Sequence, residues 1–315
     1  TDVTVTDIQA GAPITAQNAI IEGGTFQKAV HADENSSITN GTFQESVEAN
    51  GTIANGIFKK SVQAYGKITD GQFEADVTLG YNGTITGFTT SYGAGVAVEP
   101  RSGGSFGLYG NAAIQHNKST NTGNLMQGGN YYPNSDLENV SGKSSAGGGG
   151  VANLGKFTMN SLRSDAIAYN SAARFGGGLY SYSEGGQYTD RWTKLLNGGI
   201  TGNTAGEQGG GVHASPNHSG TELTLGGSVS ITGNTLTDGT DENLYLLVDT
   251  EYGASAKISV SGLTEDADIQ VVEVEGREGK DYFNGVTYET LPPEVLARIT
   301  TNNGSIFAWN EAHDT

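Results

Sequence analysis

A hydrophobic phrase recurs at short and nearly constant intervals along the first 90 residues. Isoleucine is followed by glycine three positions later and by phenylalanine five positions later, and valine then lies four residues after the phenylalanine. Because the apolar residues lie mostly at even spacings, the phrase predicts short β-strands with alternate side chains directed inward. The phenylalanines of its regular copies are Phe26, Phe43, Phe58 and Phe73, spaced 17, 15 and 15 residues apart.

A repeat of this length is too short for two packed helices, but it fits one coil of a β-solenoid. Each coil advances such a stack by about 4.8 Å, and equivalent side chains then form continuous columns in the core. The four phenylalanines should therefore form one buried stack. Asn-Gly and Asp-Gly dipeptides recur between the apolar runs, and they favour the positive φ that tight corners need. The pattern predicts an all-β chain folded as a single-stranded parallel β-helix.

A different phrase begins near residue 90. It starts with a glycine-rich triplet, continues with an apolar pair, and ends with isoleucine and, three positions later, asparagine. The pattern predicts wider coils, with glycine at a crowded corner and a ladder of asparagine amides at a turn. In the third copy this alignment places Trp192 and Leu195 in the core. The isoleucine–asparagine pairs are Ile114/Asn117, Ile167/Asn170, Ile200/Asn203 and Ile231/Asn234.

These patterns divide the chain into three regions. We expect narrow coils of about 15 residues over 1–90, wider coils over 91–274, and a C-terminal capping segment over 275–315. Within the capping segment, Pro292 and Pro293 predict the start of a short helix, because proline is favoured in the first turn.

One step of the wider repeat is much longer than the others. The chain takes 31 residues from Asn117 to Gly148, whereas the equivalent step from Asn170 to Gly176 takes 6. The excess predicts an insert near residues 118–146 that protrudes from the wall of the helix. Long loops on a rigid scaffold often carry binding residues, although an insertion without a role is an equal alternative.

Composition narrows the classes of function. The chain has 315 residues, of which 49 are glycine and none is cysteine, and its formal net charge is −18. The absence of cysteine excludes thiolate metal sites and cysteine catalysis, and it fits a secreted protein that does not rely on disulfides. The acidic charge disfavours nucleic acid and anionic lipid as ligands. No apolar run reaches the ~18 residues of a membrane helix, so we expect no membrane insertion.

The wider phrase also resembles a known group of proteins. The segments Ile200–Asn203, Gly209–Val212 and Ile231–Asn234 resemble repeats of extracellular right-handed parallel β-helix proteins from Gram-positive, often gut-dwelling, bacteria. They are similar to repeats of polymorphic surface proteins and autotransporter adhesins as well. The resemblance covers roughly residues 90–250 and implies a right-handed, pectate-lyase-like fold at the cell surface or in secreted form. It does not fix an activity, because enzymes share this architecture.

Two segments contain the aromatic residues that we expect to bind a ligand. The predicted insert contains Tyr131 and Tyr132, and a second excursion contains Tyr182 and Tyr188 shortly before Trp192. Aromatic rings stack on the apolar faces of sugars, so these four tyrosines predict a glycan-binding surface. The alternative is that such rings only fill the core or cover it; we prefer that alternative for Trp192 because it aligns with other core positions.

Catalytic and metal-binding signals are weaker. Glu184, Asp190 and Arg191 are the candidates for a hydrolytic site, but none recurs at one position of successive coils. The five histidines are scattered and form no metal-binding motif, so we expect no metal and no cofactor. Calcium is an option at the acidic segment Asp238–Glu242, for which an acidic turn is the alternative.

The sequence therefore favours an extracellular bacterial surface module that acts in adhesion by binding a glycan or a host or bacterial surface protein. One alternative is a polysaccharide lyase or glycoside hydrolase, which would require a cleft lined by converging acids. The other alternative is a passive structural stalk, which would present only a flat polar side.

Overall fold

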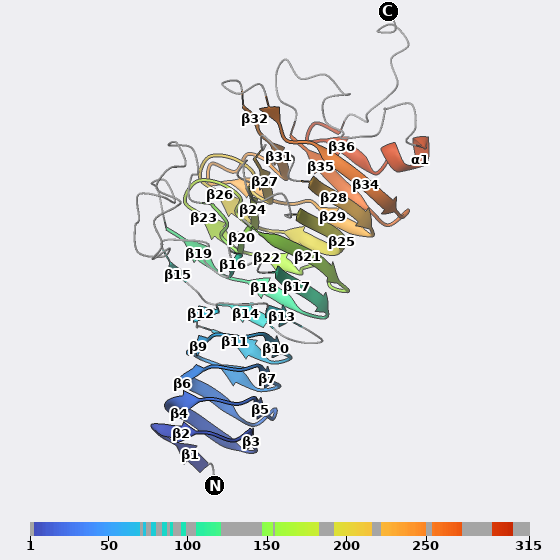
Figure 1. Cartoon of the computed structure of the whole chain (residues 1–315). Coiled ribbons are helices and arrows are strands. Elements are labelled where there is room, and N and C mark those ends of the chain that lie inside the picture. The colour runs from blue at the N-terminus through green and yellow to red at the C-terminus, as the bar shows by residue number, and fades with distance from the viewer. Residues whose placement is uncertain are drawn as a thin grey trace, which may run out of the picture.

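The computed structural model describes residues 3–69, 72–73, 77–79, 84–86, 89–90, 96–98, 105–120, 147–153, 155–182, 192–215, 222–249, 254–272 and 292–304. Within these residues the fold is all-β apart from one short helix, and nearly all strand pairs are parallel. Figure 1 shows the strands stacked in chain order from the N-terminal end to the C-terminal end, with the stack wider in its second half. The described helix is too short to cross a membrane.

One column of isoleucines runs through the whole stack. Each strand of this column pairs in parallel with the equivalent strand of the next repeat, so Ile21 lies beside Ile38 and Ile68 beside Ile85. The register continues without a break into the wide half, where Ile85 lies beside Ile114. The two sequence phrases therefore share one column. Its strands are β1 (Val3–Val5), β4 (Ala19–Phe26), β6 (Ser37–Phe43), β8 (Thr52–Ile53), β11 (Lys67–Ile68), β14 (Thr84–Thr86), β18 (Ala113–Gln115), β22 (Ile167–Ala168), β25 (Trp192–Thr201), β29 (Val229–Ile231), β35 (Asp268–Val271) and β36 (Ile299–Thr301).

A second column faces the isoleucines across the core and also spans both halves; we call it the valine column. In the narrow half it buries the valine of the short phrase, and Val77 then lies beside Phe106 of the wide phrase. Alternate residues point inward, as the even spacing predicts. Its strands are β3 (Ile14–Ala16), β5 (Val30–Ala32), β7 (Val47–Ala49), β10 (Val62–Ala64), β13 (Val77–Leu79), β17 (Ser105–Gly110), β21 (Lys156–Ser161), the first half of β25, β28 (Glu222–Gly227) and β34 (Ile258–Leu263).

The predicted phenylalanine stack is confirmed for the described rings. Phe26, Phe43 and Phe58 are fully buried, and neighbouring ring centroids lie 4.8 Å apart with nearly parallel planes. Gly41 makes room for this stack, because a Cβ at that position would lie 3.2 Å from the Phe26 and Phe43 rings, and its φ is 138°. Phe73 pairs in register with Phe58. The strands of this column are β2 (Ile8–Ala10), the ends of β4 and β6, β9 (Ile57–Phe58) and β12 (Gln72–Phe73).

Two further sets of strands widen the second half. A five-stranded sheet follows the isoleucine column, and a second set follows the glycine-rich corners. The corners are as crowded as predicted: a Cβ on Gly177 would lie 2.3 Å from the carbonyl oxygen of Gly210. The five-stranded sheet contains β15 (Thr89–Thr90), β19 (Lys118–Ser119), β23 (Ser171–Ala172), β26 (Thr204–Ala205) and β30 (Thr235–Leu236). The second set contains β16 (Val96–Val98), β20 (Val151–Asn153), β24 (Leu179–Ser181), β27 (Val212–Ala214) and β31 (Leu244–Leu246).

The predicted asparagine ladder is confirmed. From Asn170 onward, the side-chain oxygen of each ladder asparagine accepts hydrogen bonds from the backbone N–H and the side-chain amide of the ladder asparagine before it, at 2.8–3.0 Å. Asn243 continues the ladder only nine residues after Asn234, and its own amide donates to Gln270. Asn243 immediately precedes β31, at the position where earlier repeats have the third glycine of the triplet. The glycine-rich corner is therefore not repeated at β31. The ladder contains Asn117, Asn170, Asn203, Asn234 and Asn243, all at most 1% exposed.

The described C-terminal residues continue the stack. Helix α1 (Pro293–Leu296) begins at the predicted proline pair, and β36 after it places Ile299 beside Ile269. A short antiparallel hairpin, β32 (Val248–Asp249) with β33 (Ala254–Ser255), lies between β31 and β34. The remaining residues of the expected capping segment, 275–291 and 305–315, lie outside the described residues.

The predicted core position of Trp192 is wrong. Lys156 lies beside Trp192, so the inward position beside Phe157 belongs to Thr193 instead. Thr193 is fully buried, and its hydroxyl accepts a hydrogen bond from the Asn153 amide at 2.7 Å. Trp192 is half-buried on the outer face, because inward residues of a strand are two positions apart and Leu195 is three positions from Trp192.

Candidate functional site

Most of the predicted site residues lie outside the described part of the chain. The predicted binding residues Tyr131, Tyr132 and Tyr188 are among them, as are the catalytic candidates. Those candidates are Glu184, Asp190 and Arg191. Their roles therefore remain predictions, and Tyr182 is the one predicted site residue that the structure describes.

The two predicted excursions fall between strands whose partners are already in register. Residues 121–146 lie between β19 and β20 in the chain, and residues 183–191 lie between β24 and β25. On either side of the first segment, β19 pairs with β23 and β20 pairs with β24. The first residues of the predicted insert, Lys118 and Ser119, belong to the five-stranded sheet through β19, and the insert from 121 to 146 lies outside the described residues.

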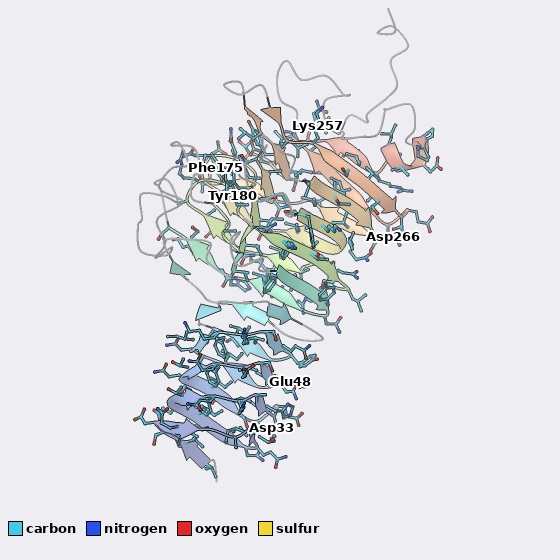
Figure 2. All side chains as sticks on the ribbon, viewed as in Figure 1. Asp33, Glu48, Phe175, Tyr180, Lys257 and Asp266 are labelled. Carbon is cyan, nitrogen blue, oxygen red and sulfur yellow. The ribbon has the colours of Figure 1, made fainter. Side chains whose placement is uncertain are left out.

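Tyr182 belongs to a small aromatic cluster that is separate from the main core. It is half-buried, and its ring stacks on the buried Tyr180 with centroids 6.2 Å apart. Phe175 packs in the same cluster, and the Arg174 guanidinium lies 4.6 Å from the Phe175 ring centroid. Figure 2 places Phe175 and Tyr180 together in the wide half of the stack. One face of Tyr182 is therefore covered by protein.

His213 extends this aromatic cluster along the stack. Its ring lies between Tyr180 and Tyr245, at centroid distances of 5.3 and 5.4 Å. Its Nε2 lies 3.3 Å from the Gln208 side-chain oxygen, and its buried Nδ1 has no hydrogen-bond partner among the described residues. Burial lowers the pKa of His213 to about 3, because the charged ring would lose its hydration. The imidazole is therefore neutral in the folded protein at neutral pH.

This burial predicts a loss of stability in mild acid. Unfolding frees His213 to bind a proton near its ordinary pKa of 6.5, so between pH 6.5 and about 3 the unfolded chain holds one more proton. The free energy of unfolding should fall by about 1.4 kcal/mol for each pH unit in that range. We expect His213→Phe, which keeps an aromatic ring in the column, to remove about 2 kcal/mol of the loss between pH 6.5 and 5. Denaturant titrations of both proteins measure this difference; parallel pH profiles would contradict the buried neutral ring.

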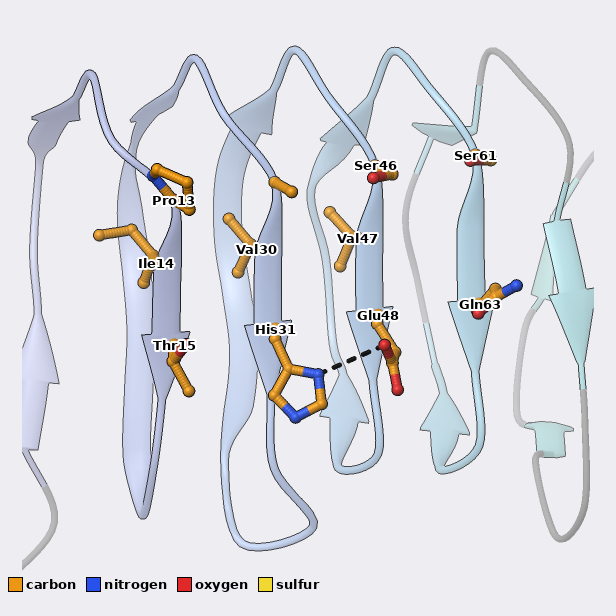
Figure 3. A pocket seen from close by; sticks show the side chains of 11 residues that line it. Pro13, Ile14, Thr15, Val30, His31, Ser46, Val47, Glu48, Ser61 and Gln63 are labelled. Carbon is orange, nitrogen blue, oxygen red and sulfur yellow. Dashed lines mark ion pairs between the residues drawn. The ribbon is translucent and has the colours of Figure 1, made fainter.

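An open groove crosses the outer face of the valine column in the narrow half (Figure 3). It has a volume of about 340 Å³ and passes over β3, β5, β7 and β10. Its floor is a row of small residues, each immediately before the first residue of its strand. A row of polar side chains borders the floor. The small row is Pro13, Ala29, Ser46 and Ser61, and the polar row is Thr15, His31, Glu48 and Gln63.

The groove presents hydroxyl, amide, imidazole and carboxylate groups at regular intervals. His31 and Glu48 stand in register on neighbouring strands, with the His31 Nδ1 and a Glu48 carboxylate oxygen 3.5 Å apart. Both side chains remain nearly half exposed, so the pair contributes little to stability and its polar atoms can still contact a ligand. Glu48 supplies the one carboxylate among the lining residues.

A stacked pair of exposed rings lies at another corner of the wide half. His116 and Tyr169 each precede a ladder asparagine and have a φ of 57°, where the next two repeats have glycine. A left-handed backbone costs an ordinary residue roughly 1–2 kcal/mol. The two rings stack with centroids 5.2 Å apart, and Tyr169 is 53% exposed. The pair is a second candidate for ligand contact on the described surface.

Two carboxylates of the acidic segment Asp238–Glu242 accept hydrogen bonds from backbone N–H groups. Asp238 accepts a hydrogen bond from the backbone N–H of Thr240, and this bond lowers its pKa. Glu242 accepts from the backbone N–H of Gly209, while burial raises its pKa. Among the described residues, no group of three or more His, Asp or Glu side chains is placed to hold a metal ion. The calcium option therefore gains no support from this turn.

Sequence reasoning missed both the groove and the ring pair. The small residue before each buried valine is visible in the sequence, but outward positions carry no hydrophobic signal. The ring pair could have been found from the residue before each ladder asparagine, which is glycine at 202 and 233 but His116 and Tyr169 in the earlier copies.

No protein-family model, curated protein or solved structure matches this chain.

Proposed function

We propose that the chain is a parallel β-solenoid, of the right-handed extracellular kind implied by the sequence resemblance. The support is the parallel register, in which equivalent residues of successive repeats lie side by side. This register holds from β4 to β36 in the isoleucine column and as far as β34 in the valine column. Such a stack grows by repetition and leaves long, regular outer faces. Each repeat advances the stack by about the 4.8 Å that separates the phenylalanine rings.

We further propose that the module acts in adhesion at a bacterial surface, by binding an extended glycan in the groove of Figure 3. The observation that carries this proposal is the repetition of small and polar residues across four strands. A polymer that lies along the stack meets a small floor residue and a polar neighbour at every step. Hydroxyl and amide groups suit the hydroxyls of a neutral sugar, and the net charge of −18 of the chain disfavours a polyanion.

The groove supports binding better than hydrolysis. Glycoside hydrolysis uses two carboxyl groups on either side of the scissile bond. The groove has Glu48 as its single carboxylate. The lyase or hydrolase alternative would have to rest on Glu184, Asp190 and Arg191. A protein ligand in place of a glycan is a further possible outcome of the binding test described next.

Filling the groove should abolish glycan binding. Ser46→Leu places a larger side chain on the exposed floor, so the affinity for a glycan selected on an array should fall at least about tenfold, or ~1.4 kcal/mol. Thr42→Leu, on a different outer face of the same repeat, is the matched control and should bind like the original protein. Thermal unfolding should change little in either variant, since both are surface substitutions. Unchanged binding by Ser46→Leu would place the site elsewhere.

A further inference from the structure

We propose that Asn40 and Asn55 are sites of covalent self-modification. At each site the backbone nitrogen of the following glycine attacks the asparagine side chain, and water completes the conversion to aspartate and isoaspartate. The two residues occupy one position of the short phrase, two residues after its isoleucine, in neighbouring repeats. They lie between the isoleucine column and the phenylalanine column, away from the groove, so this proposal does not depend on the proposed function.

In both residues the side chain is folded back on the nitrogen that must attack it. The backbone N–H of Gly41 donates to the Asn40 side-chain oxygen at 2.9 Å, and the backbone N–H of Gly56 donates to the Asn55 side-chain oxygen at 2.7 Å. The carbon that is attacked, Cγ, is bonded directly to that oxygen, so the reacting atoms are held close together, as ring closure requires. Both asparagines are exposed, so water can reach the amide.

The fold itself requires the glycine that makes each dipeptide reactive. The φ angles of Gly41 and Gly56 are 138° and 150°, and a Cβ at either position would lie 3.0–3.2 Å from a phenylalanine ring. Glycine also has no side chain to obstruct the approach of its own nitrogen to Cγ. The packing of the phenylalanine column therefore keeps the attacking nitrogen unhindered wherever asparagine precedes this glycine.

The reaction needs water and no other reactant. The glycine nitrogen loses its proton and forms a bond to Cγ, while the side-chain amide takes up a proton and leaves as ammonia. The product is a cyclic imide, and water then opens one of its two carbonyl groups. One opening gives aspartate, and the other gives isoaspartate, in which the main chain runs through the side chain and gains one atom. Each product adds a negative charge to the surface.

The two products should affect the stack differently. The fourth copy of the phrase has Asp70 at the same position, so an aspartate is compatible with the repeat. Isoaspartate at position 40 lengthens the chain between Ile38 and Phe43, and pairing with both adjacent repeats fixes these two residues in register. We therefore expect the aspartate form to unfold like the original protein and the isoaspartate form to unfold at a lower temperature.

Asn197 precedes Gly198 and provides an internal control, because its side chain is held elsewhere. Its amide donates to the Asn160 side-chain oxygen at 2.7 Å, and its oxygen accepts from the backbone N–H and the hydroxyl of Ser228, each at 2.9 Å. Ring closure at Asn197 would have to break these hydrogen bonds. The same dipeptide should therefore react slowly at this position in the folded protein.

Incubation at mildly alkaline pH in water enriched in a heavy oxygen isotope, followed by peptide mapping with mass spectrometry, tests the sites. We expect isotope uptake at Asn40 and Asn55 at a rate at least about tenfold above that at Asn197 in the folded protein. In denaturant the three rates should converge, because the local sequence alone then decides. Equal rates at all three positions in the folded protein would overturn the proposal, as would uptake at Asn40 and Asn55 in the unfolded chain only.

Two variants at one position test the mechanism and its consequence. Asn55→Gln keeps the amide but moves its carbonyl carbon one bond further from the glycine nitrogen, so uptake at position 55 should stop while Asn40 still reacts. Asn55→Asp reproduces one product and should unfold at the temperature of the original protein, whereas the isoaspartate fraction, separated by ion exchange, should unfold below it. Continued uptake at position 55 in Asn55→Gln would contradict the mechanism, and an isoaspartate fraction as stable as Asn55→Asp would contradict the effect on the stack.

Discussion

Replacing Phe43 with alanine is expected to lower the free energy of unfolding by about 3–5 kcal/mol. Phe43 is fully buried and stacks on Phe26 and Phe58, so its removal leaves a cavity between two rings that the flanking repeats hold apart. The repeat spacing is fixed by the backbone pairing on both sides, so the cavity cannot close by a local shift. Denaturant unfolding followed by circular dichroism measures the loss.

Ile57 lies on β9, the strand that pairs with the strand of Phe43, and it is the matched control for this substitution. It precedes Phe58 on β9 but points outward and is 36% exposed. Ile57→Ala should therefore cost much less than Phe43→Ala, within about 1 kcal/mol of the original protein. Equal losses in the two variants would show that the phenylalanine rings do not form a packed column.

Replacing Asn203 with alanine should have a comparable effect through hydrogen bonds. The Asn203 side-chain oxygen accepts from the backbone and side chain of Asn170, and its amide donates to Asn234 and to the carbonyl oxygen of Ile167. All these groups are buried, and each buried group left unsatisfied costs about 1–3 kcal/mol. We expect Asn203→Ala to lower the free energy of unfolding by ~3 kcal/mol or more.

Hydrogen exchange can locate this loss in the ladder. The amide hydrogen of Asn170 should exchange faster in Asn203→Ala, because its acceptor has been removed. Asn203→Asp keeps the acceptor oxygen but loses the donor and buries a charge, so it should be destabilised at pH 7 and partly recover as the carboxyl group is protonated. Asn35→Ala, in an exposed turn, is the control and should stay within about 0.5 kcal/mol. An Asn203→Ala protein as stable as this control would contradict the ladder.

The features that could be predicted from the sequence are those whose residues recur at a fixed interval. Phe26, Phe43 and Phe58 share one position of a short phrase, and the ladder asparagines share one position of a longer phrase, so their stacking follows from the parallel register. The single isoleucine column is harder to foresee, because the spacing changes abruptly between Ile85 and Ile114.

Two kinds of feature were not predicted from the sequence: core positions occupied by polar residues, and sites formed by outward-facing residues. Thr193 is a core residue by register and is satisfied by hydrogen bonds to Asn153 and Ser181, so a search for large apolar residues selects Trp192 instead. The groove depends on small residues that carry no hydrophobic signal, and the pairing of Lys156 with Trp192 depends on a register that composition cannot supply.

The most direct test of the proposed function is a glycan array combined with an assay for new reducing ends and for the unsaturated products of lyase cleavage. The account predicts that the protein binds an extended glycan, that Ser46→Leu loses this binding while Thr42→Leu keeps it, and that no cleavage products form. Cleavage that disappears on replacing Asp190 or Glu184 would contradict the account and identify an enzyme. Absence of binding to any extended glycan would contradict it equally.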